Sequence, residues 1–127
     1  MRLLLDTHSL IWALQGSNQL SADARRQILD PAHEIWMSAV SVYEYGLQVR
    51  LGRMTPFPLP IAVESLDLGC RELSITPEHA GCAASFPLIH RDPWDRILAA
   101  QAILEDMSVV TRDPSISIAA LGAPTIW

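Results

Sequence analysis

The sequence predicts a single α/β domain over residues 1–127, built on a parallel β-sheet of four to five strands with helices on both faces. Short apolar segments that suit buried strands alternate with longer segments that suit helices, and this alternation is typical of a parallel sheet. Half of the residues are hydrophobic, which favours a folded core over a disordered chain. We find no internal repeat, low-complexity segment or interdomain linker.

Local signals define the first elements. Residues 2–6 are a continuous apolar run that ends in an acid, as expected for a strand buried on both faces. Residues 10–14 favour a helix. The next helix begins at Ser21, whose side chain suits the N-cap position, and Pro31 stops it. Residues 34–38 form the second apolar strand.

The third helix has two candidate N-caps, Ser38 and Ser41, and it ends at Leu51. Gly52 suits the left-handed position that often follows a helix. Residues 54–60 contain three prolines and therefore predict a loop.

The alternation continues with a helix at residues 61–68, a strand at residues 72–75 and a helix that ends near Pro87. Asp92 suits the N-cap of the following helix, because Pro93 suits the first helical position. The remaining predicted elements are a strand at residues 108–111, a short helix at residues 114–120 and an edge strand at residues 124–127.

The charge and cysteine content restrict the function. The formal net charge is −5, and all nine basic residues are arginine, a side chain that pairs well with phosphate. Two cysteines suggest neither a disulfide framework nor a zinc site. We see no secretory signal and no apolar run that is long enough to span a membrane, so we expect a cytoplasmic protein without membrane contact.

Four carboxylates are candidates for a common site. Asp6 and Asp113 each follow an apolar strand, and open parallel sheets place their sites outside the carboxyl ends of the strands. Glu44 and Asp95 each lie near the start of a predicted helix. Carboxylates that meet in one cleft repel one another, and a divalent cation removes that repulsion. Ligation by oxygen alone favours Mg²⁺ or Mn²⁺ over zinc.

Each acid also has a purely structural explanation, which the sequence leaves open. Asp6, Asp92 and Asp113 precede predicted helices and suit N-cap positions. Glu44 has capping-box spacing with the serine three residues before it. Asp95 would favour the positive end of its helix dipole.

Neighbouring polar side chains complete the predicted site. Thr7, Asp92 and Thr111 are expected to hold the carboxylates or bound waters by hydrogen bonds. The candidates for contacts to substrate phosphates are Arg91, Arg96 and Arg112. The chain has no glycine-rich phosphate loop and no nucleophile elbow, which argues against nucleotide-binding and serine-hydrolase chemistry.

Four segments of the chain, at residues 3–8, 38–44, 90–102 and 110–114, resemble the PIN-domain ribonucleases. Their order and spacing, together with the ending Ile126-Trp127, resemble the VapC-type toxins of bacterial toxin–antitoxin modules. The resemblance covers essentially the whole chain. One departure is Gln48, where close relatives usually carry lysine one turn after the second acid.

The resemblance implies a Mg²⁺ or Mn²⁺ site whose four acids fall on Asp6, Glu44, Asp95 and Asp113. It implies an endoribonuclease that cleaves RNA through a metal-activated water and leaves a 5′-phosphate. It also implies a homodimer and a cognate antitoxin that occludes the cleft. The alternatives are a non-catalytic PIN-fold module for dimerisation or partner binding, which the four retained acids argue against, and a DNA nuclease, for which 127 residues leave little room.

Overall fold

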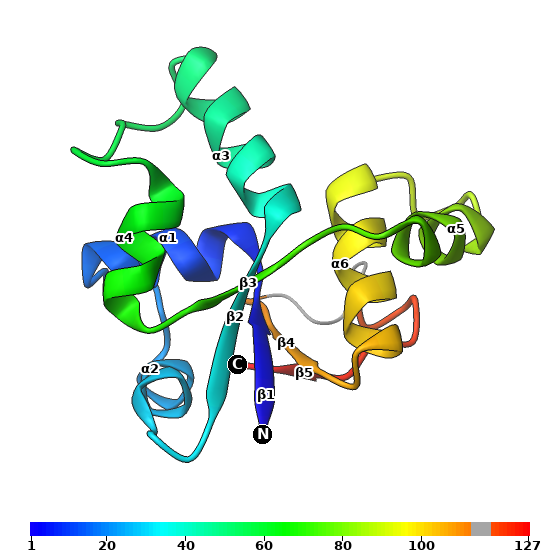
Figure 1. The fold of residues 1–127 in the computed structure, drawn as a ribbon, viewed down its shortest axis with the longest axis horizontal. Coiled ribbons are helices and arrows are strands. Elements are labelled where there is room, and N and C mark those ends of the chain that lie inside the picture. The colour runs from blue at the N-terminus through cyan, green and yellow to red at the C-terminus, as the bar shows by residue number, and fades with distance from the viewer. Residues whose placement is uncertain (113–117) are drawn as a thin grey trace.

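A five-stranded parallel sheet crosses the molecule in the computed structural model, which describes residues 1–112 and 118–127 (Figure 1). The strands are β1 (Arg2–Leu5), β2 (Glu34–Ser38), β3 (Arg71–Leu73), β4 (Ser108–Val110) and β5 (Thr125–Ile126). Their order across the sheet is β3-β2-β1-β4-β5, so the apolar strand β1 lies at the centre between β2 and β4. The predicted fold class is confirmed.

The helices cover both faces of the sheet. They are α1 (Thr7–Gln15), α2 (Ala22–Leu29), α3 (Ala39–Arg50), α4 (Ile61–Leu68), α5 (Pro77–Ser85) and α6 (Pro93–Leu104). In Figure 1, α1, α2 and α4 lie on one side of the sheet, and α6 lies on the other with α5 packed against it. Among these helices in the described part of the chain, none combines the length and apolar character needed to cross a membrane.

Two hydrophobic cores follow from this arrangement, one on each face of the sheet. Alternate residues of β1 point to opposite faces, so Leu3 and Leu5 enter one core and Leu4 enters the other. The first core also contains Leu10 of α1, and the second contains Leu98 of α6. These side chains are fully buried, and their burial fixes α1 and α6 against the carboxyl half of the sheet.

Side-chain caps define most helix starts, as predicted. The Ser21 hydroxyl accepts a hydrogen bond from the backbone N–H of Ala24 at 3.0 Å. In α3 the N-cap is Ser38, which accepts from the N–H of Val40 at 3.1 Å. Ser41 is a buried residue within the helix, so the capping-box explanation for Glu44 is wrong.

Two element boundaries differ clearly from the prediction, and several others shift by a residue or two. Helix α1 begins at Thr7 rather than at residue 10, because Asp6 caps it directly. Strand β3 ends at Leu73, since its partner β2 turns into α3 after Ser38 and leaves residues 74–75 nothing to pair with. The predicted helix at residues 114–120 falls largely on residues 113–117, which lie outside the described residues.

Beyond that stretch, residues 118–122 form turns instead of a helix. The backbone N–H of Leu121 donates to the carbonyl of Ile118 at 3.2 Å, and Gly122 has a φ of +97°, which ends any helical path. These turns bring the chain back to the predicted edge strand, which the structure places at β5 beside β4.

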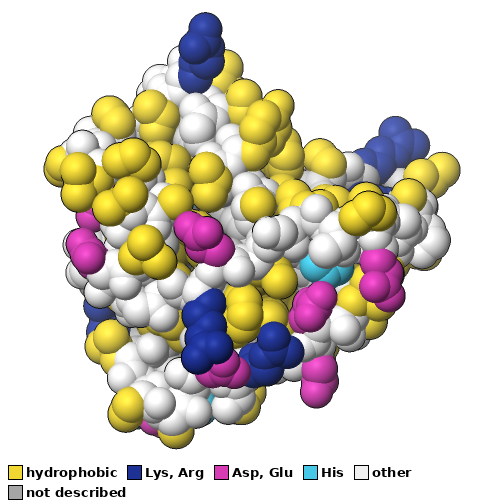
Figure 2. Space-filling model, viewed as in Figure 1, with side chains coloured by type: hydrophobic (Ala, Val, Ile, Leu, Met, Phe, Trp, Pro, Cys, Tyr) yellow, Lys and Arg dark blue, Asp and Glu magenta, His cyan; other side chains and the backbone are white. Residues whose placement is uncertain are grey.

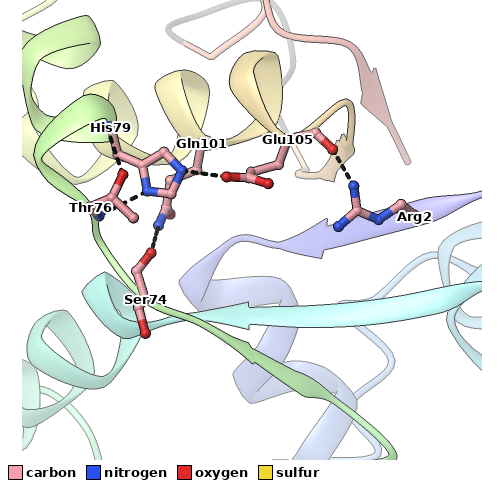
Figure 3. Close-up of polar contacts among 6 residues, drawn as sticks. All are labelled: Arg2, Ser74, Thr76, His79, Gln101 and Glu105. Atoms are coloured by element: carbon pink, nitrogen blue, oxygen red, sulfur yellow. Dashed lines mark hydrogen bonds and ion pairs between the residues drawn. The ribbon is translucent and has the colours of Figure 1, made fainter.

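A polar network holds α5 against the C-terminal end of α6 (Figure 3). The buried His79 accepts a hydrogen bond at Nδ1 from the N–H of Thr76 at 3.1 Å, so its proton lies on Nε2. Nε2 then donates to Oε1 of Glu105 at 2.9 Å. Arg2 donates to the carbonyl of Glu105, which ties the same end of α6 to β1.

Candidate functional site

An acidic cleft of about 450 Å³ lies where the carboxyl ends of β1 and β4 meet α1, α3 and α6. Its described lining residues are Asp6, Thr7, His8, Trp12, Glu44, Asp92, Asp95, Leu98, Thr111, Arg112 and Ile118. Three of the four predicted acids therefore line one cleft, with the three predicted supporting residues. The fourth predicted acid, Asp113, lies outside the described residues.

Asp6 enters the cleft at the junction of β1 and α1. Its Oδ1 accepts a hydrogen bond from the N–H of Ser9 at 2.8 Å, so Asp6 is the N-cap of α1. Its own N–H donates to the carbonyl of Val110 at 3.1 Å, which joins the ends of the two central strands. The cap uses one carboxylate oxygen, so the N-cap role and a role in the cleft are compatible for Asp6.

Glu44 enters the cleft from α3 and is held by a hydroxyl of α1. Thr7 Oγ1 donates to Glu44 Oε1 at 2.6 Å, and Thr7 Oγ1 lies 3.0 Å from the Oγ atom of Ser41. A hydroxyl has only one proton, so when Thr7 gives it to the carboxylate, Ser41 must be the donor in the second contact. Thr7 and Ser41 are both buried, and their chain of hydroxyls fixes Glu44 in one position.

Burial raises the pKa of Glu44 above its ordinary value of 4.5, because the half-buried carboxylate loses hydration. The hydrogen bond from Thr7 and the nearby His8 lower this pKa, and the negative charges of Asp92 and Asp95 raise it. The balance is a raised pKa. The cleft therefore holds a carboxylate that is destabilised in its charged form, which is the condition that a bound cation relieves.

We predict that Glu44→Gln makes the protein more stable at neutral pH when divalent cations are absent. A raised pKa in the folded state adds stability below pH 4.5, and this contribution is lost as the pH rises through the folded-state pKa. Glutamine does not ionise, so the variant does not lose this stability as the pH rises. Thermal melts in EDTA between pH 4.5 and 8 should show the difference in Tm between variant and wild type growing with pH. A lower Tm for the variant at neutral pH would contradict the assignment.

Asp92 and Asp95 both lie at the start of α6. Asp92 is exposed, and its Oδ1 accepts hydrogen bonds from the N–H groups of Trp94 at 2.9 Å and Asp95 at 3.3 Å. The predicted N-cap is therefore confirmed. Asp95 is half-buried in the first turn of the helix. Asp6 shows that an N-cap can also line the cleft, so the capping role of Asp92 does not exclude it from holding a cation. Asp95 is favoured over Asp92 because its side chain is more deeply buried.

The carboxylates of the cleft supply only oxygen donors, which suits Mg²⁺ or Mn²⁺. Within residues 1–112 and 118–127, no three His, Cys, Asp or Glu side chains stand close enough to hold one ion. The described acids therefore do not form a complete ligand set in this arrangement. The donor chemistry and the raised pKa of Glu44 suit a divalent cation, and Asp6, Glu44 and Asp95 are the described candidates to contribute ligands to it.

The three predicted phosphate-binding arginines differ in position. Arg112 lines the cleft, and its guanidinium lies 5.5 Å from the centre of the Trp12 ring. Arg91 is exposed outside the cleft and donates from Nε to the carbonyl of Leu88 at 3.3 Å. Arg96 does not line the cleft, and its guanidinium donates to backbone carbonyls between residues 83 and 90. The predicted contact of Arg96 to a substrate phosphate is therefore not supported, because its guanidinium N–H groups already bind backbone carbonyls.

Sequence reasoning missed Ser41 as part of the site. Ser41 and Glu44 are three residues apart on one helix, so they share a face, and that spacing was the available signal. The same spacing also matches a capping box, and only the position of the true N-cap, Ser38, separates the two explanations.

The model of the PIN domain family matches residues 3–121 of the chain. Among solved structures, VapBC2 from Rickettsia felis bound to a promoter DNA fragment is similar at 15% identity and a TM-score of 0.71, with 100% of this chain and 99% of that chain covered. FitAcB from Neisseria gonorrhoeae is similar at 24% identity and a TM-score of 0.68, with 98% and 96% covered.

A toxin–antitoxin complex from Klebsiella pneumoniae is similar at 16% identity and a TM-score of 0.64, with 98% of this chain and 96% of that chain covered. At these identities the likeness to solved structures establishes the fold. A comparison with curated proteins found no significant match.

Proposed function

The chain belongs to the PIN domain family, and we propose that it is a Mg²⁺- or Mn²⁺-dependent endoribonuclease that acts as the toxin of a toxin–antitoxin pair. The observation that carries the proposal is the acidic cleft. Its acids come from the end of β1, from α3 and from α6, which are far apart in the sequence. A fold that assembles several carboxylates at the carboxyl edge of its sheet has a site suited to a cation and a phosphate.

We assign the metal-holding role to Asp6, Glu44, Asp95 and Asp113. A divalent cation held there would lower the pKa of a bound water and stabilise negative charge on the phosphate under attack. The chain's own residues supply position and orientation. Thr7 holds Glu44 through the 2.6 Å hydrogen bond, and the N-cap bond of Asp6 fixes its carboxylate at the strand end.

The residues around the cleft have supporting roles in this proposal. Thr111 is buried at the end of β4, and Asp92 lies near Asp95 at the start of α6. In the proposal, both residues orient the metal-holding acids or waters. Arg112 lines the cleft, which supports a role in binding a flanking phosphate of the RNA. Arg91, which is exposed beside Asp92, is a second candidate for such a contact.

We further propose that the protein acts in the cytoplasm as a homodimer and that a cognate antitoxin covers the cleft. Exposed hydrophobic side chains support a protein partner. Figure 2 shows hydrophobic side chains gathered over α3 and α4. Tyr43 of α3, Leu51 directly after α3 and Leu66 of α4 are each more than half exposed. Contiguous exposed apolar surface is a feature of protein-binding sites. The Klebsiella pneumoniae relative is described as a toxin–antitoxin complex, which supports the same proposal.

Metal removal tests the catalytic proposal. Purified protein without antitoxin should cleave RNA in the presence of Mn²⁺ and stop in EDTA. Asp6→Asn should lose cleavage while it keeps its Tm, because asparagine caps a helix nearly as well as aspartate. Cleavage that continues undiminished in EDTA would exclude the metal mechanism. RNA that stays intact with every cation, while the protein binds a partner, would favour the non-catalytic PIN-fold module.

A further inference from the structure

Arg96, in the first turn of α6, binds the backbone that precedes its own helix. Its Nη1 atom donates to the carbonyls of Pro87 and His90, each at 2.7 Å. Its Nη2 atom donates to the carbonyls of Ala83 and Phe86, each at 2.8 Å. The two Nη atoms of a guanidinium carry four hydrogens, and these four short contacts account for all of them. The side chain is half-buried in this position.

Two of the carbonyls near Arg96 belong to the last turn of α5. The last carbonyls of a helix lack partners within the helix, and they form the negative end of its dipole. Arg96 meets this need at Ala83, with a longer contact of 3.4 Å to Ala84. A side chain of α6 therefore caps α5, and the cap joins the end of one helix to the start of the next.

The link between α5 and α6 has little other support. Phe86 packs partly buried against the second core, but Leu88 and Ile89 are 75% and 84% exposed, so burial of apolar side chains does not fix the path of residues 87–91. The contacts of Arg96 to the carbonyls of Pro87 and His90 tie this link to the helix that follows it. A second tie between α5 and α6, from His79 to Glu105, lies at the other end of both helices (Figure 3).

We propose that Arg96 is a positioning residue for the acidic cleft. By fixing the link and the first turn of α6, it holds Asp92 and Asp95 in place against the acids that enter from β1 and α3. This inference rests on the proposed function of those acids in holding a divalent cation. The geometry requires arginine, because the planar fork reaches the end of α5 and the link together, whereas lysine offers donors from a single point.

Two measurements on Arg96→Gln test this role. In the metal-free protein, hydrogen exchange should become at least tenfold faster in residues 86–96, while exchange in β1 stays unchanged. Calorimetric titration with Mn²⁺ should show an affinity roughly 10–100-fold lower, the usual effect of losing support for metal ligands. Arg96→Lys, which keeps the charge, is the second variant and should show the same defects to a smaller extent. It also serves if the glutamine variant does not fold.

Glu105→Ala is the matched control, because it removes the other tie between the same two helices at the end far from the cleft. This variant should lose stability and keep its Mn²⁺ affinity. Arg25→Gln is a second control, since Arg25 of α2 also donates to a backbone carbonyl, that of Ser17, at 2.6 Å. It should keep its Mn²⁺ affinity too.

Unchanged exchange in residues 86–96 of Arg96→Gln would overturn the positioning role. Unchanged Mn²⁺ affinity together with a raised KM for RNA would overturn it in favour of a direct contact to substrate. Failure of the proposed function gives a different result, in which the wild-type protein itself binds no Mn²⁺. That result overturns the positioning role for a metal site, whatever happens to exchange in residues 86–96 of the Arg96 variants.

Discussion

Asp95→Asn is expected to abolish RNA cleavage and to remove most of the Mn²⁺ affinity with little loss of stability. Asp95 lines the cleft from the first turn of α6 and is half-buried there, so asparagine keeps its size and removes its charge. The loss should exceed the 10–100-fold that follows from removing a group that only supports a metal ligand. Calorimetric titration with Mn²⁺, cleavage assays and thermal melts on the same preparation measure the three quantities.

Asp92 provides the matched comparison, since it lies three residues earlier in the same cleft. Asp92→Asn should retain much of the activity, because asparagine can still accept from the N–H groups that Asp92 caps. Asp92→Ala should cost about 0.5–2 kcal/mol of stability through loss of the cap. If Asp92→Asn loses the metal and Asp95→Asn keeps it, the two roles are reversed.

Thr7→Val is expected to weaken both the fold and the cleft. Valine matches the shape of threonine but removes the hydroxyl that donates to Glu44 at 2.6 Å. The carboxylate then loses a hydrogen bond in a partly desolvated position, which typically costs about 1–3 kcal/mol. Because Thr7 also lowers the pKa of Glu44, its loss should raise that pKa further. We expect Mn²⁺ affinity to fall roughly 10–100-fold, and urea unfolding and calorimetry measure the two effects.

Thr7→Ser and Ser41→Ala separate the hydroxyl from the packing around it. Thr7→Ser keeps the donor and should retain most of the Mn²⁺ affinity. Ser41→Ala removes the hydroxyl that binds Thr7 and leaves the hydrogen bond from Thr7 to Glu44. Its effect on Mn²⁺ affinity should therefore lie between that of wild type and that of Thr7→Val. A Thr7→Ser variant as defective as Thr7→Val would mean that the methyl group, and not the hydrogen bond, matters at this position.

The sequence predicted the sheet and most helices because their signals are local. Strand β1 is an uninterrupted apolar run, and the caps at Ser21 and Asp92 depend on residues within one turn. The errors occurred where distant residues decide. Strand β3 ends early because β2 has turned away, and the choice between Ser38 and Ser41 as N-cap depends on where β2 stops pairing.

Hydrophobic pattern and residue spacing are enough to predict that acids follow the strands of a parallel sheet and begin its helices. How those acids are held depends instead on contacts between elements that are distant in the sequence. Thr7 and Glu44 are 37 positions apart and meet because α1 and α3 pack beside each other at the sheet edge. Arg96 reaches its carbonyls because α5 packs antiparallel to α6. Such contacts depend on how buried apolar faces set the helices, and no local signal records them.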